Sequence, residues 1–592
     1  MKTSGSIQNI SISNPNGPRI DSVHFGTDGW RAILDEDFNP CSVARVADAC
    51  ARAFSRQLDD WAANAASGRT ATAVDDISGA VAAAANGASS AIAAANITLN
   101  ALATSRRTGQ TEQQPALVIG YDCRREAGKY AALVAAVVAA HGFQAIVSDR
   151  YCPTPALCWS IAHLPQAIGG IMLTSSHNPA EYLGIKLRMA DGGASPKSFT
   201  DEVESLLSDD LPDCYPHALA AFAAAVNATP ENPASALSLA PELCFANLMG
   251  DYLEALVASV DTEMIRQAEL QVVLDPLFGA GRGYQAQVLA NMGVQVSEVN
   301  GAADPSFQGL HPEPILPWVS TGQAEVVCLG YDACLITDGD ADRIGAIDEH
   351  GNYVTSHRIM ALLISHLAED RGQRGRVVRT SAGSNLLMRQ CQRLGLELAT
   401  RPIGFKWIYA EMLKGDVLIG GEESGGIGFP THVRERDGLL AGLLLVEMMA
   451  QRQKSLSALV EELLAELGCL EYARRDLRLS ESQKTQFVEK HLAVASSEAP
   501  GGLSAGDISP CPAAVGGNAL PSFYQPLFAA LHEELIDVDQ SDGIMFRFAS
   551  DAWLLVRTSG TEPLVRVYSE ASDKSRVDEL LDIGCALAEG EI

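Results

Sequence analysis

The sequence predicts an α/β protein with three α/β units and one smaller α+β unit at the C-terminal end. Over most of the 592 residues, short apolar runs with strand character alternate with helix-like stretches. This alternation is typical of parallel or mixed sheets with helices on their faces. From about residue 524 the pattern changes to three successive strand-like runs and a final helix. The length is far beyond the roughly 250–300 residues at which a single hydrophobic core stops growing, so several domains are expected.

The first unit shows the alternation most clearly. Apolar runs at 117–122, 145–148 and 167–173 predict buried strands, and the apolar stretch 130–141 predicts a buried helix. Residues 64–114 are rich in Ala, Ser, Thr and Asn, which leaves a loose helical insertion, a linker or disorder as open alternatives.

The later units repeat the strand–turn–helix pattern. Pro-, Ala-, Ser- and Gly-rich segments at 209–243 and 496–523 predict linkers or surface insertions, and residues 1–20 a loose leader. The expected strands are 271–276, 333–337, 344–347, 376–380, 543–548, 552–557 and 564–569, and the expected helices are 386–394 and 573–588. The expected domains are 21–210, 240–352, 353–475 and 476–592.

Composition excludes several classes of function. The net charge of −30 disfavours binding to nucleic acid or to an anionic membrane surface. Thirteen cysteines without any Cys-x-x-Cys pair fit free thiols in a reducing compartment, so we expect a cytoplasmic protein. The longest apolar stretch is too short to span a bilayer, and no secretory signal is visible.

The run Thr-Ser-Ser-His-Asn-Pro at 174–179 follows the predicted strand 167–173 and places Ser176 beside His177 on a tight loop. Serine is a weak nucleophile unless a base accepts its proton. An ordinary strand-to-helix turn explains such a run equally well when it is taken alone.

A second loop carries Asp338, Asp340 and Asp342 at alternate positions, followed by Arg343. In extended backbone such side chains share a face, and three converging carboxylates call for a cation, with oxygen ligands favouring Mg²⁺ or Ca²⁺. An EF-hand loop is one alternative, because Glu349 lies at its twelfth position, but Arg343 stands where that loop needs glycine. A solvated acidic turn is the other.

Two more loops carry polar groups among glycines. The run 420–428 contains Glu422 and Ser424, which could hydrogen-bond neighbouring hydroxyls of a sugar. The run 557–563 combines Arg557 with hydroxyls and a glycine in a turn that suits an anion, and it is not a Walker A loop. Structural turns are the alternative for both. Two basic residues follow glycine turns elsewhere in the chain, Arg31 and Lys406.

These four loops, in this order, resemble the α-D-phosphohexomutase family, above all its phosphoglucomutase and phosphomannomutase members. The resemblance extends from about Phe25 to near the C-terminus. It implies four domains around a central cleft, with one loop from each domain. It also implies that Ser176 carries a phosphoryl group and that Arg343 lies beside it. Mg²⁺ is then expected at Ser176, Asp338, Asp340 and Asp342.

The resemblance assigns the remaining candidates as well. Lys186, in a Gly-Ile-Lys stretch, and Arg31 match catalytic positions of the family, and either His177 or Lys186 is the general base. The residues expected at the sugar are Glu422, Ser424, Lys406, His432 and Arg436. Those expected at the substrate's own phosphate are Arg557, Ser559, Gly560, Thr561 and Arg566.

Two features predict the branch of the family to which the chain is most similar. Gly426 stands where the mannose-type branch has histidine, and His432 with Arg436 resembles the glucose-type branch. We therefore expect a phosphoglucomutase, with glucose 1,6-bisphosphate as intermediate and activator. The alternatives are another sugar preference, a glucose-1,6-bisphosphate synthase and a catalytically silent sensor. The expected partner is a small sugar phosphate, bound by a monomer or a weak dimer.

Overall fold

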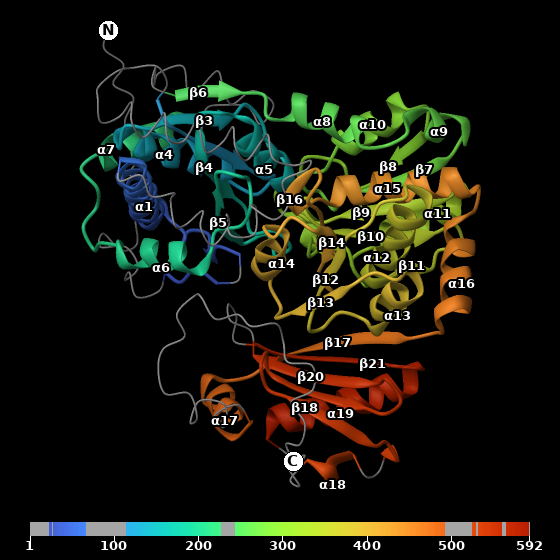
Figure 1. Cartoon of the computed structure of the whole chain (residues 1–592). Helices are drawn as coiled ribbons and strands as arrows, with labels where there is room; N and C mark the ends of the chain where they lie inside the picture. The colour runs from blue at the N-terminus through green and yellow to red at the C-terminus, as the bar shows by residue number, and fades with distance from the viewer. Residues whose placement is uncertain are drawn as a thin grey trace.

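Four β-sheets follow one another along the chain, each with its own helices (Figure 1). The computed structural model describes residues 23–26, 28–66, 114–225, 243–491, 524–528, 531–558 and 564–590. Three sheets mix parallel and antiparallel strands between helices, and the fourth is antiparallel throughout. The predicted fold class, three α/β units and a C-terminal α+β unit, is confirmed.

The first sheet has six strands in the order β1-β5-β4-β2-β3-β6. Helices cover both of its faces, and every residue of β2 and β4 is buried, which explains why their sequences are continuously apolar. Its strands are β1 (Trp30–Ile33), β2 (Ala116–Tyr121), β3 (Gln144–Ser148), β4 (Ala167–Leu173), β5 (Tyr182–Met189) and β6 (Leu243–Ala246), and its helices are α1 (Pro40–Ala66), α4 (Ala127–Ala140), α5 (Thr154–His163), α6 (Lys197–Ser205) and α7 (Tyr215–Ala225).

The turn between β4 and β5 carries the Ser-His-Asn-Pro run. β4 runs parallel to β2, and β5 returns antiparallel to it, with Leu173 opposite Ile185. The chain therefore reverses within the residues between Leu173 and Tyr182, and Ser176 lies at the carboxyl end of a buried strand. In open α/β sheets this is the edge at which ligands bind.

The second sheet places the three aspartates in a hairpin. Its order is β11-β10-β9-β7-β8, and β9 pairs antiparallel with β10, with Thr337 opposite Ile344. The EF-hand alternative is wrong, because strands flank the loop where that motif has helices. The elements are β7 (Gln271–Asp275), β8 (Gln295–Glu298), β9 (Ala333–Thr337), β10 (Ile344–Asp348), β11 (Tyr353–Val354), α8 (Met249–Ala258), α9 (Thr262–Gln267), α10 (Tyr284–Asn291), α11 (Ser320–Leu329) and α12 (Ser356–Ser365).

The third sheet has the order β13-β12-β14-β15-β16, and the turn between β14 and β15 carries Glu422 and Ser424. Glycines on this hairpin keep the two strands close to a helix: a Cβ at Gly420 would lie 2.4 Å from Ile408. The elements are η4 (His366–Asp370), β12 (Arg376–Thr380), α13 (Asn385–Leu394), β13 (Leu398–Arg401), α14 (Phe405–Met412), β14 (Val417–Gly421), β15 (Ile427–Phe429), β16 (Val433–Arg436), α15 (Gly438–Arg452) and α16 (Leu456–Leu467).

The fourth sheet has the order β17-β21-β20-β19-β18, with α19 packed against it. Arg557 and Arg566 lie opposite each other on β20 and β21, on either side of the residues that join the two strands. The elements are β17 (Glu471–Arg478), α17 (Glu481–His491), α18 (Gln525–Phe528), β18 (Leu535–Asp539), β19 (Ile544–Phe548), β20 (Trp553–Thr558), β21 (Leu564–Ala571) and α19 (Lys574–Glu589).

The segments expected to be linkers have mixed outcomes. The prediction for 209–243 is wrong in part, because Tyr215–Ala225 forms α7 and buries Ala218, Ala221 and Phe222. Alanine-rich composition suits a helix as well as a linker. The leader, most of 64–114 and the segment 496–523 lie outside the described residues.

The expected domain boundaries stay predictions. Two strands extend past them in the sheet pairing: β6, within 240–352, pairs with β3 of the first sheet, and β17, which begins at Glu471, pairs with β21 of the fourth. In the described portion of the chain, no helix is both long enough and apolar enough to cross a bilayer.

We expect His357, at the start of α12, to make the fold sensitive to acid. Its side chain is buried against Tyr472, with ring centroids 4.5 Å apart, and burial with nearby Arg379 and Arg358 lowers its pKa to about 3. When the pH falls below the ordinary histidine pKa of about 6.5, His357 is protonated in the unfolded chain but stays neutral in the folded chain. Stability is therefore lost as the pH falls from 6.5 towards 3, by about 2 kcal/mol at pH 5 relative to pH 8.

Urea unfolding at pH 8 and pH 5 measures this effect. His357→Phe, which keeps a ring against Tyr472, is expected to reduce the loss of stability between the two pH values by that amount. His350→Gln is the control, because the side chain of His350 is 67% exposed. An equal pH response of wild type and His357→Phe would contradict the prediction.

Candidate active site

Ser176 lies on a backbone turn that hydrogen bonds hold in an unusual conformation. Its φ is +50°, a left-handed backbone conformation that residues other than glycine rarely adopt. The Ser176 N–H donates to Thr174 Oγ1 (2.8 Å), and the Thr174 hydroxyl donates to Asp122 Oδ2 (2.6 Å). Strain of this kind persists only where the surroundings fix it, and it concentrates at functional sites.

Arg124 fixes the same turn from the inside of the protein. Its Nη2 donates to the carbonyl oxygens of Ser176 and Asn178, each at 2.6 Å, and its Nη1 to those of Pro179 (2.7 Å) and Tyr182 (3.0 Å). The carboxylate of Asp122 lies 3.3 Å from its Nε. Sequence analysis missed Arg124; its place just after the strand 117–122 was the available signal.

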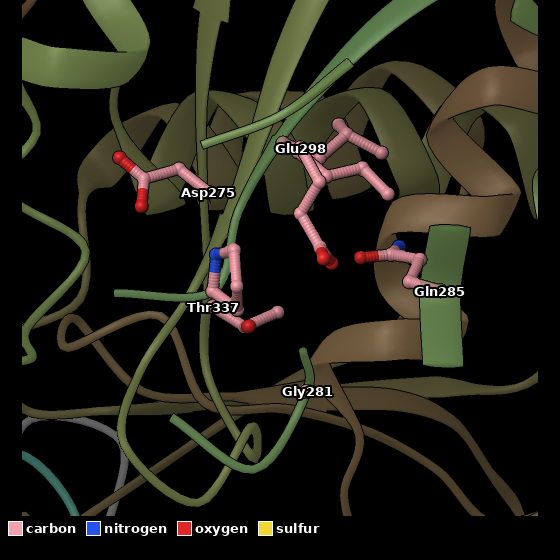
Figure 2. Close-up of a pocket in the computed structure, with 8 residues that line it drawn as sticks. Asp275, Gly281, Gln285, Glu298 and Thr337 are labelled. Atoms are coloured by element: carbon pink, nitrogen blue, oxygen red, sulfur yellow. The ribbon is translucent and has the colours of Figure 1, made fainter. Parts of the chain in front are cut away.

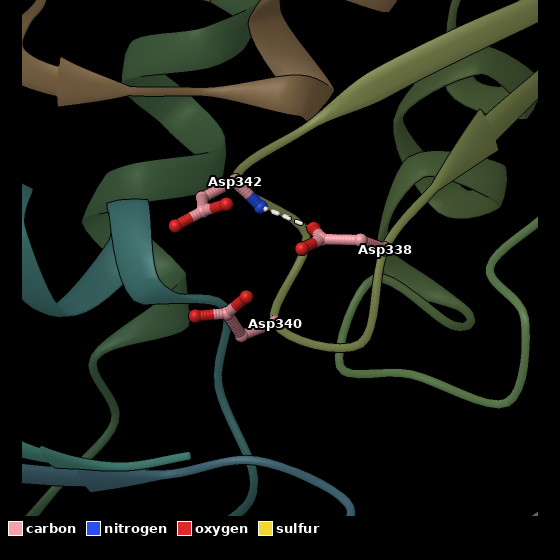
Figure 3. A group of neighbouring side chains, drawn as sticks. All are labelled: Asp338, Asp340 and Asp342. Atoms are coloured by element: carbon pink, nitrogen blue, oxygen red, sulfur yellow. Dashed lines mark hydrogen bonds between the residues drawn. The ribbon is translucent and has the colours of Figure 1, made fainter. Parts of the chain in front are cut away.

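The three aspartates of the β9–β10 hairpin converge on one point (Figure 3). All three are fully buried, and one carboxylate oxygen from each lies within 4.8 Å of the others. The backbone N–H of Asp342 donates to Asp338 Oδ1 (3.0 Å), which closes the loop on itself. The carboxylates converge as predicted, but not in extended backbone: the loop turns, and Ala341 has φ of +57°.

The serine turn and the aspartate loop meet directly. The Ser176 hydroxyl donates to Asp338 Oδ2 at 2.8 Å, although 162 positions separate the two residues. Their backbones touch at Gly339, where a Cβ would lie 2.4 Å from the carbonyl oxygen of Ser176. Only glycine allows this approach.

Lys186, on β5, extends its amine among carboxylates. Its Nζ lies 2.8 Å from Asp340 Oδ2 and 3.0 Å from Asp342 Oδ2, and also 3.0 Å from Asp28. Burial favours the neutral amine, but the charges of Asp28, Asp340 and Asp342 outweigh it and raise the pKa of Lys186 above its usual value. Lys186 is therefore a buried ammonium.

Arg436, at the end of β16, joins the aspartate loop to the third sheet. Its Nη2 lies 2.9 Å from Asp342 Oδ2, and its Nη1 donates to Glu422 Oε2 (3.1 Å). Burial raises the pKa of Glu422 to about 7, against the opposing effect of Arg436. Glu422 can thus accept or donate a hydrogen bond near neutral pH.

Asp28 is the second residue that sequence analysis missed. Its carboxylate contacts Arg188 (3.0 Å), Lys186 (3.0 Å) and Arg436, and together these cations hold its pKa well below the usual value despite its burial. Arg188 in turn lies 2.9 Å from Glu435. Asp28 stands in the run Phe25–Ala32, whose glycine turn pointed to Arg31 alone.

The donor set fits a divalent cation. Asp340 Oδ1 and Asp342 Oδ1 are buried without a hydrogen-bond partner among the described residues. Burial and the charges of Asp342 and Asp340 raise the pKa of Asp338 well above its usual value, so a cation next to the cluster would stabilise its ionised form. Three carboxylates without nitrogen or sulfur ligands favour Mg²⁺ or Ca²⁺.

The expected catalytic side chains surround Ser176. His177 Nδ1 lies 3.4 Å from Ser176 Oγ, and burial, with Arg343 and Arg31 nearby, lowers the pKa of His177 well below its usual value. Arg31 Nη1 donates to Asn178 Oδ1 at 2.7 Å. Arg343 Nε lies 3.9 Å from both Asp338 and Asp342.

The run 420–428 lies against the aspartate loop. The Ile344 N–H donates to the carbonyl oxygen of Gly425 (3.0 Å), and Arg343 forms a β-bridge with Gly426. Ser424 is half-buried on the same turn. Lys406, half-buried on α14, has its pKa lowered by burial and then by the charges of Lys197 and Arg557.

His432 lies elsewhere. Its Nε2 is 3.3 Å from Asp437 Oδ2, its ring faces Tyr252, and it lines a cavity of about 240 Å³ with Leu367 and Leu440. In the described portion of the chain it makes no contact with Ser176 or the aspartates. The residue precedes β16, near α8 and α15, whereas Arg436 ends that strand, and the expected role of His432 at the sugar stays a prediction.

Of the run 557–563, the structure describes only Arg557 and Thr558. Arg557 Nε donates to Asp542 Oδ1 at 2.8 Å, and Arg566 Nε lies 3.8 Å from Asp476. Ser559, Gly560 and Thr561 lie outside the described residues, so their expected roles stay predictions.

A pocket behind the aspartate loop is filled by its own side chains (Figure 2). Asp275 and Thr337, at the ends of β7 and β9, line it together with Gln285. Asp275 Oδ1 accepts from Leu277 N (3.0 Å) and Asn300 Nδ2 (2.9 Å), and burial raises the pKa of Asp275 to about 6. The side chains that line this pocket pack next to the hairpin and leave no room for a ligand.

Comparisons with known families agree with this geometry. Sequence models of all four domains of the phosphoglucomutase/phosphomannomutase family match the chain: α/β/α domain I over 73–211, α/β/α domain II over 250–351, α/β/α domain III over 355–467 and the C-terminal domain over 478–583.

Similar curated proteins carry several substrate names. A phosphoglucomutase/phosphomannomutase of Thermococcus kodakarensis is 29% identical over 478 residues, which are 81% of this chain and 90% of that protein. A phosphoglucosamine mutase of Symbiobacterium thermophilum is 28% identical, over 78% of this chain and 87% of its own length. A phosphoglucomutase of Komagataeibacter xylinus is 25% identical, over 74% and 76%.

Solved structures share the fold. That of a Thermus thermophilus protein named as a phosphomannomutase matches with a TM-score of 0.68 and 26% identity, and covers 96% of this chain and 99% of its own. An open form of a Paramecium phosphoglucomutase, parafusin, matches with a TM-score of 0.67 at 17% identity, over 97% and 95% of the two chains.

Proposed function

Because the chain belongs to the phosphoglucomutase/phosphomannomutase family, we propose that it interconverts glucose 1-phosphate and glucose 6-phosphate. The reaction proceeds through a phosphoryl group on Ser176 and a glucose 1,6-bisphosphate intermediate. One observation carries the proposal: the Ser176 hydroxyl donates to a carboxylate of a fully buried three-aspartate cluster, 162 positions away. A chain that needed only a stable turn would not bury three carboxylates against a serine, because burying so many charges is costly even with Lys186 and Arg436 beside two of them.

Charge neutralisation is the main task of this site. Asp338, Asp340 and Asp342 would hold Mg²⁺, which supplies positive charge next to the phosphoryl group on Ser176. Arg343, beside two of these aspartates, adds a guanidinium on the same side. With the negative charge of the phosphoryl group reduced, a sugar hydroxyl can attack the phosphorus.

We assign the general base to His177 in preference to Lys186. A base must start unprotonated, and the lowered pKa of His177 leaves its imidazole neutral at pH 7, whereas the raised pKa of Lys186 keeps its amine charged. His177 Nδ1, 3.4 Å from Ser176 Oγ, would accept the proton of the attacking sugar hydroxyl and return it to Ser176 Oγ as the bond between that oxygen and phosphorus breaks. When Ser176 recovers a phosphoryl group from the bisphosphate, the proton moves the other way, from the Ser176 hydroxyl through His177 to the sugar oxygen that leaves. Lys186 then acts as a fixed positive charge among the aspartates.

Substrate binding uses groups from the third and fourth sheets. Glu422 and Ser424 would hydrogen-bond the sugar hydroxyls, and Arg436 orients Glu422 through its 3.1 Å contact. Arg557 would bind the phosphate that is not being transferred, because a guanidinium offers forked contacts to phosphate. The bisphosphate must turn over within the cleft so that each phosphate in turn faces Ser176.

A second candidate function is phosphoglucosamine mutase activity, which the names of several similar proteins favour. The two sugars differ at one substituent, so the choice depends on contacts near Glu422 and Ser424. A site built to hydrogen-bond one substituent rejects the other strongly.

The sugar preference is tested with glucose 1-phosphate, mannose 1-phosphate and glucosamine 1-phosphate, each with and without added glucose 1,6-bisphosphate. We expect kcat/KM for glucose 1-phosphate to exceed the others by roughly 10-fold or more, with bisphosphate acting only as an activator. A higher kcat/KM for glucosamine 1-phosphate would select the second candidate. Net accumulation of bisphosphate would indicate a synthase.

A further inference from the structure

The fourth sheet packs against loops of the third unit through an apolar contact. Ala382 follows β12 and Ile403 follows β13, and both are buried against one face of the fourth sheet. That face contributes Met545, Trp553, Leu555 and Tyr568. Figure 1 shows β17 and the strands beside it lying directly below β12 and β13. The contact joins the unit that carries Arg557 to the unit that carries the run 420–428.

One carboxylate at the edge of this contact binds both units. Asp542 Oδ2 accepts from the Ser381 hydroxyl (2.7 Å) and from the Ile403 N–H (2.7 Å), both on loops of the third unit. Its Oδ1 accepts from Arg557 Nε (2.8 Å), in its own unit. The side chain is only 12% exposed, so these hydrogen bonds are largely shielded from water.

The turn that bears Asp542 is itself fixed against β20. The next residue, Gly543, has φ of +103°, and a Cβ there would lie 2.6 Å from the carbonyl oxygen of Val556. Any other residue would push the turn away from the strand that contains Arg557. Asp542 is thus held next to Arg557 by backbone packing as well as by its own carboxylate.

We infer that Asp542 is a positioning residue that couples phosphate binding at Arg557 to closure of the fourth unit on the third. Its carboxylate engages Nε and so orients the guanidinium, whose terminal nitrogens make forked contacts to phosphate. The same carboxylate holds Ser381 and Ile403 only while the two units are in contact. Contact between the two units therefore fixes both oxygens of the carboxylate that orients Arg557, whereas separation leaves Oδ2 without these two donors. This inference rests on the proposed function, because it takes Arg557 as the phosphate ligand.

Asp542→Asn tests whether one side chain must accept hydrogen bonds from Arg557 and from the third unit at the same time. The variant keeps the size of the side chain, but one of the two acceptor oxygens becomes an NH₂ donor. This NH₂ group would face either Arg557 Nε or the Ser381 hydroxyl and Ile403 N–H, which are themselves donors. The variant cannot accept from Arg557 and from the third unit together. Asp551→Asn is the matched control: Asp551 also lies at this contact, 2.9 Å from Arg389, but in the described residues it does not touch Arg557.

We expect Asp542→Asn to raise KM for the sugar phosphate roughly 10-fold with kcat changed less than about 3-fold, the loss expected for a hydrogen bond to a charged group. Small-angle X-ray scattering should show a larger radius of gyration for this variant than for wild type, without ligand. Asp551→Asn should change neither quantity. In an Arg557→Gln background, Asp542→Asn should have little further effect on KM, since it acts through Arg557.

An unchanged KM, an unchanged radius of gyration, or equal effects of the two Asn variants would overturn the inference. Kinetics are measured with whichever sugar phosphate the wild type turns over, so a different sugar preference does not affect the result. Wild type without activity on any sugar phosphate would refute the proposed function instead. The scattering measurement needs no turnover and tests closure in either case.

Discussion

Ser176→Ala is expected to lower mutase turnover by at least about 10³-fold while changing the affinity for sugar phosphate less than about 3-fold. The hydroxyl is the atom that carries the phosphoryl group in the proposed cycle, and alanine leaves no substitute. Binding should persist, because Glu422, Arg436 and Arg557 lie on other segments of the chain. Turnover is measured by coupled assay, and affinity by calorimetry with glucose 6-phosphate.

The adjacent serine supplies a stringent control. Ser175 is fully buried, and its hydroxyl has no hydrogen-bond partner among the described residues. Ser175→Ala removes the same atoms one residue away, so it should leave turnover within about 3-fold of wild type. Substantial mutase activity in Ser176→Ala, or equal losses in the two variants, would refute the role of Ser176.

Removal of divalent metal is expected to have the second largest effect. Treatment with EDTA should lower turnover at least about 10²-fold, and added Mg²⁺ should restore it, because the phosphoryl group would otherwise face three carboxylates. Asp340→Asn should weaken Mg²⁺ binding at least about 10-fold, since it removes one of three anionic ligands. Calorimetric titration with Mg²⁺, without substrate, measures this affinity directly.

Asp275→Asn is the control for the metal experiment. Asp275 is also a buried carboxylate close to the aspartate loop, but it lies in the filled pocket behind β9 (Figure 2). Its replacement should leave the Mg²⁺ affinity unchanged even if stability falls. Full activity after thorough chelation, or an equal loss of affinity in the Asp340 and Asp275 variants, would contradict the assignment of the metal site.

Local patterns were sufficient to predict much of this fold. The strands expected at 167–173, 333–337 and 376–380 match β4, β9 and β12 residue for residue. β4 and β9 are buried along their whole length, and their sequences are almost continuously apolar and end abruptly at turn residues, whereas β12 keeps two valines between Arg376 and Arg379. The carboxylates of the aspartate loop also converge as predicted, through a turn rather than extended backbone, because the whole cluster lies within one hairpin.

The residues missed depend on long-range contacts. Asp28 meets Arg436 across 408 positions, and Arg124 meets the serine turn across 52 to 58. Neither pairing leaves a periodic signal in the sequence. The helix α7 was missed because its alanines also suit a linker.

The most direct test of the central claim is peptide mass spectrometry of the protein purified without phosphatase treatment and then incubated with glucose 1,6-bisphosphate. We expect a single added phosphoryl group on the peptide that contains Ser176, and its loss on incubation with excess glucose 1-phosphate in step with bisphosphate formation. An active enzyme whose Ser176 stays unmodified throughout turnover would contradict the claim.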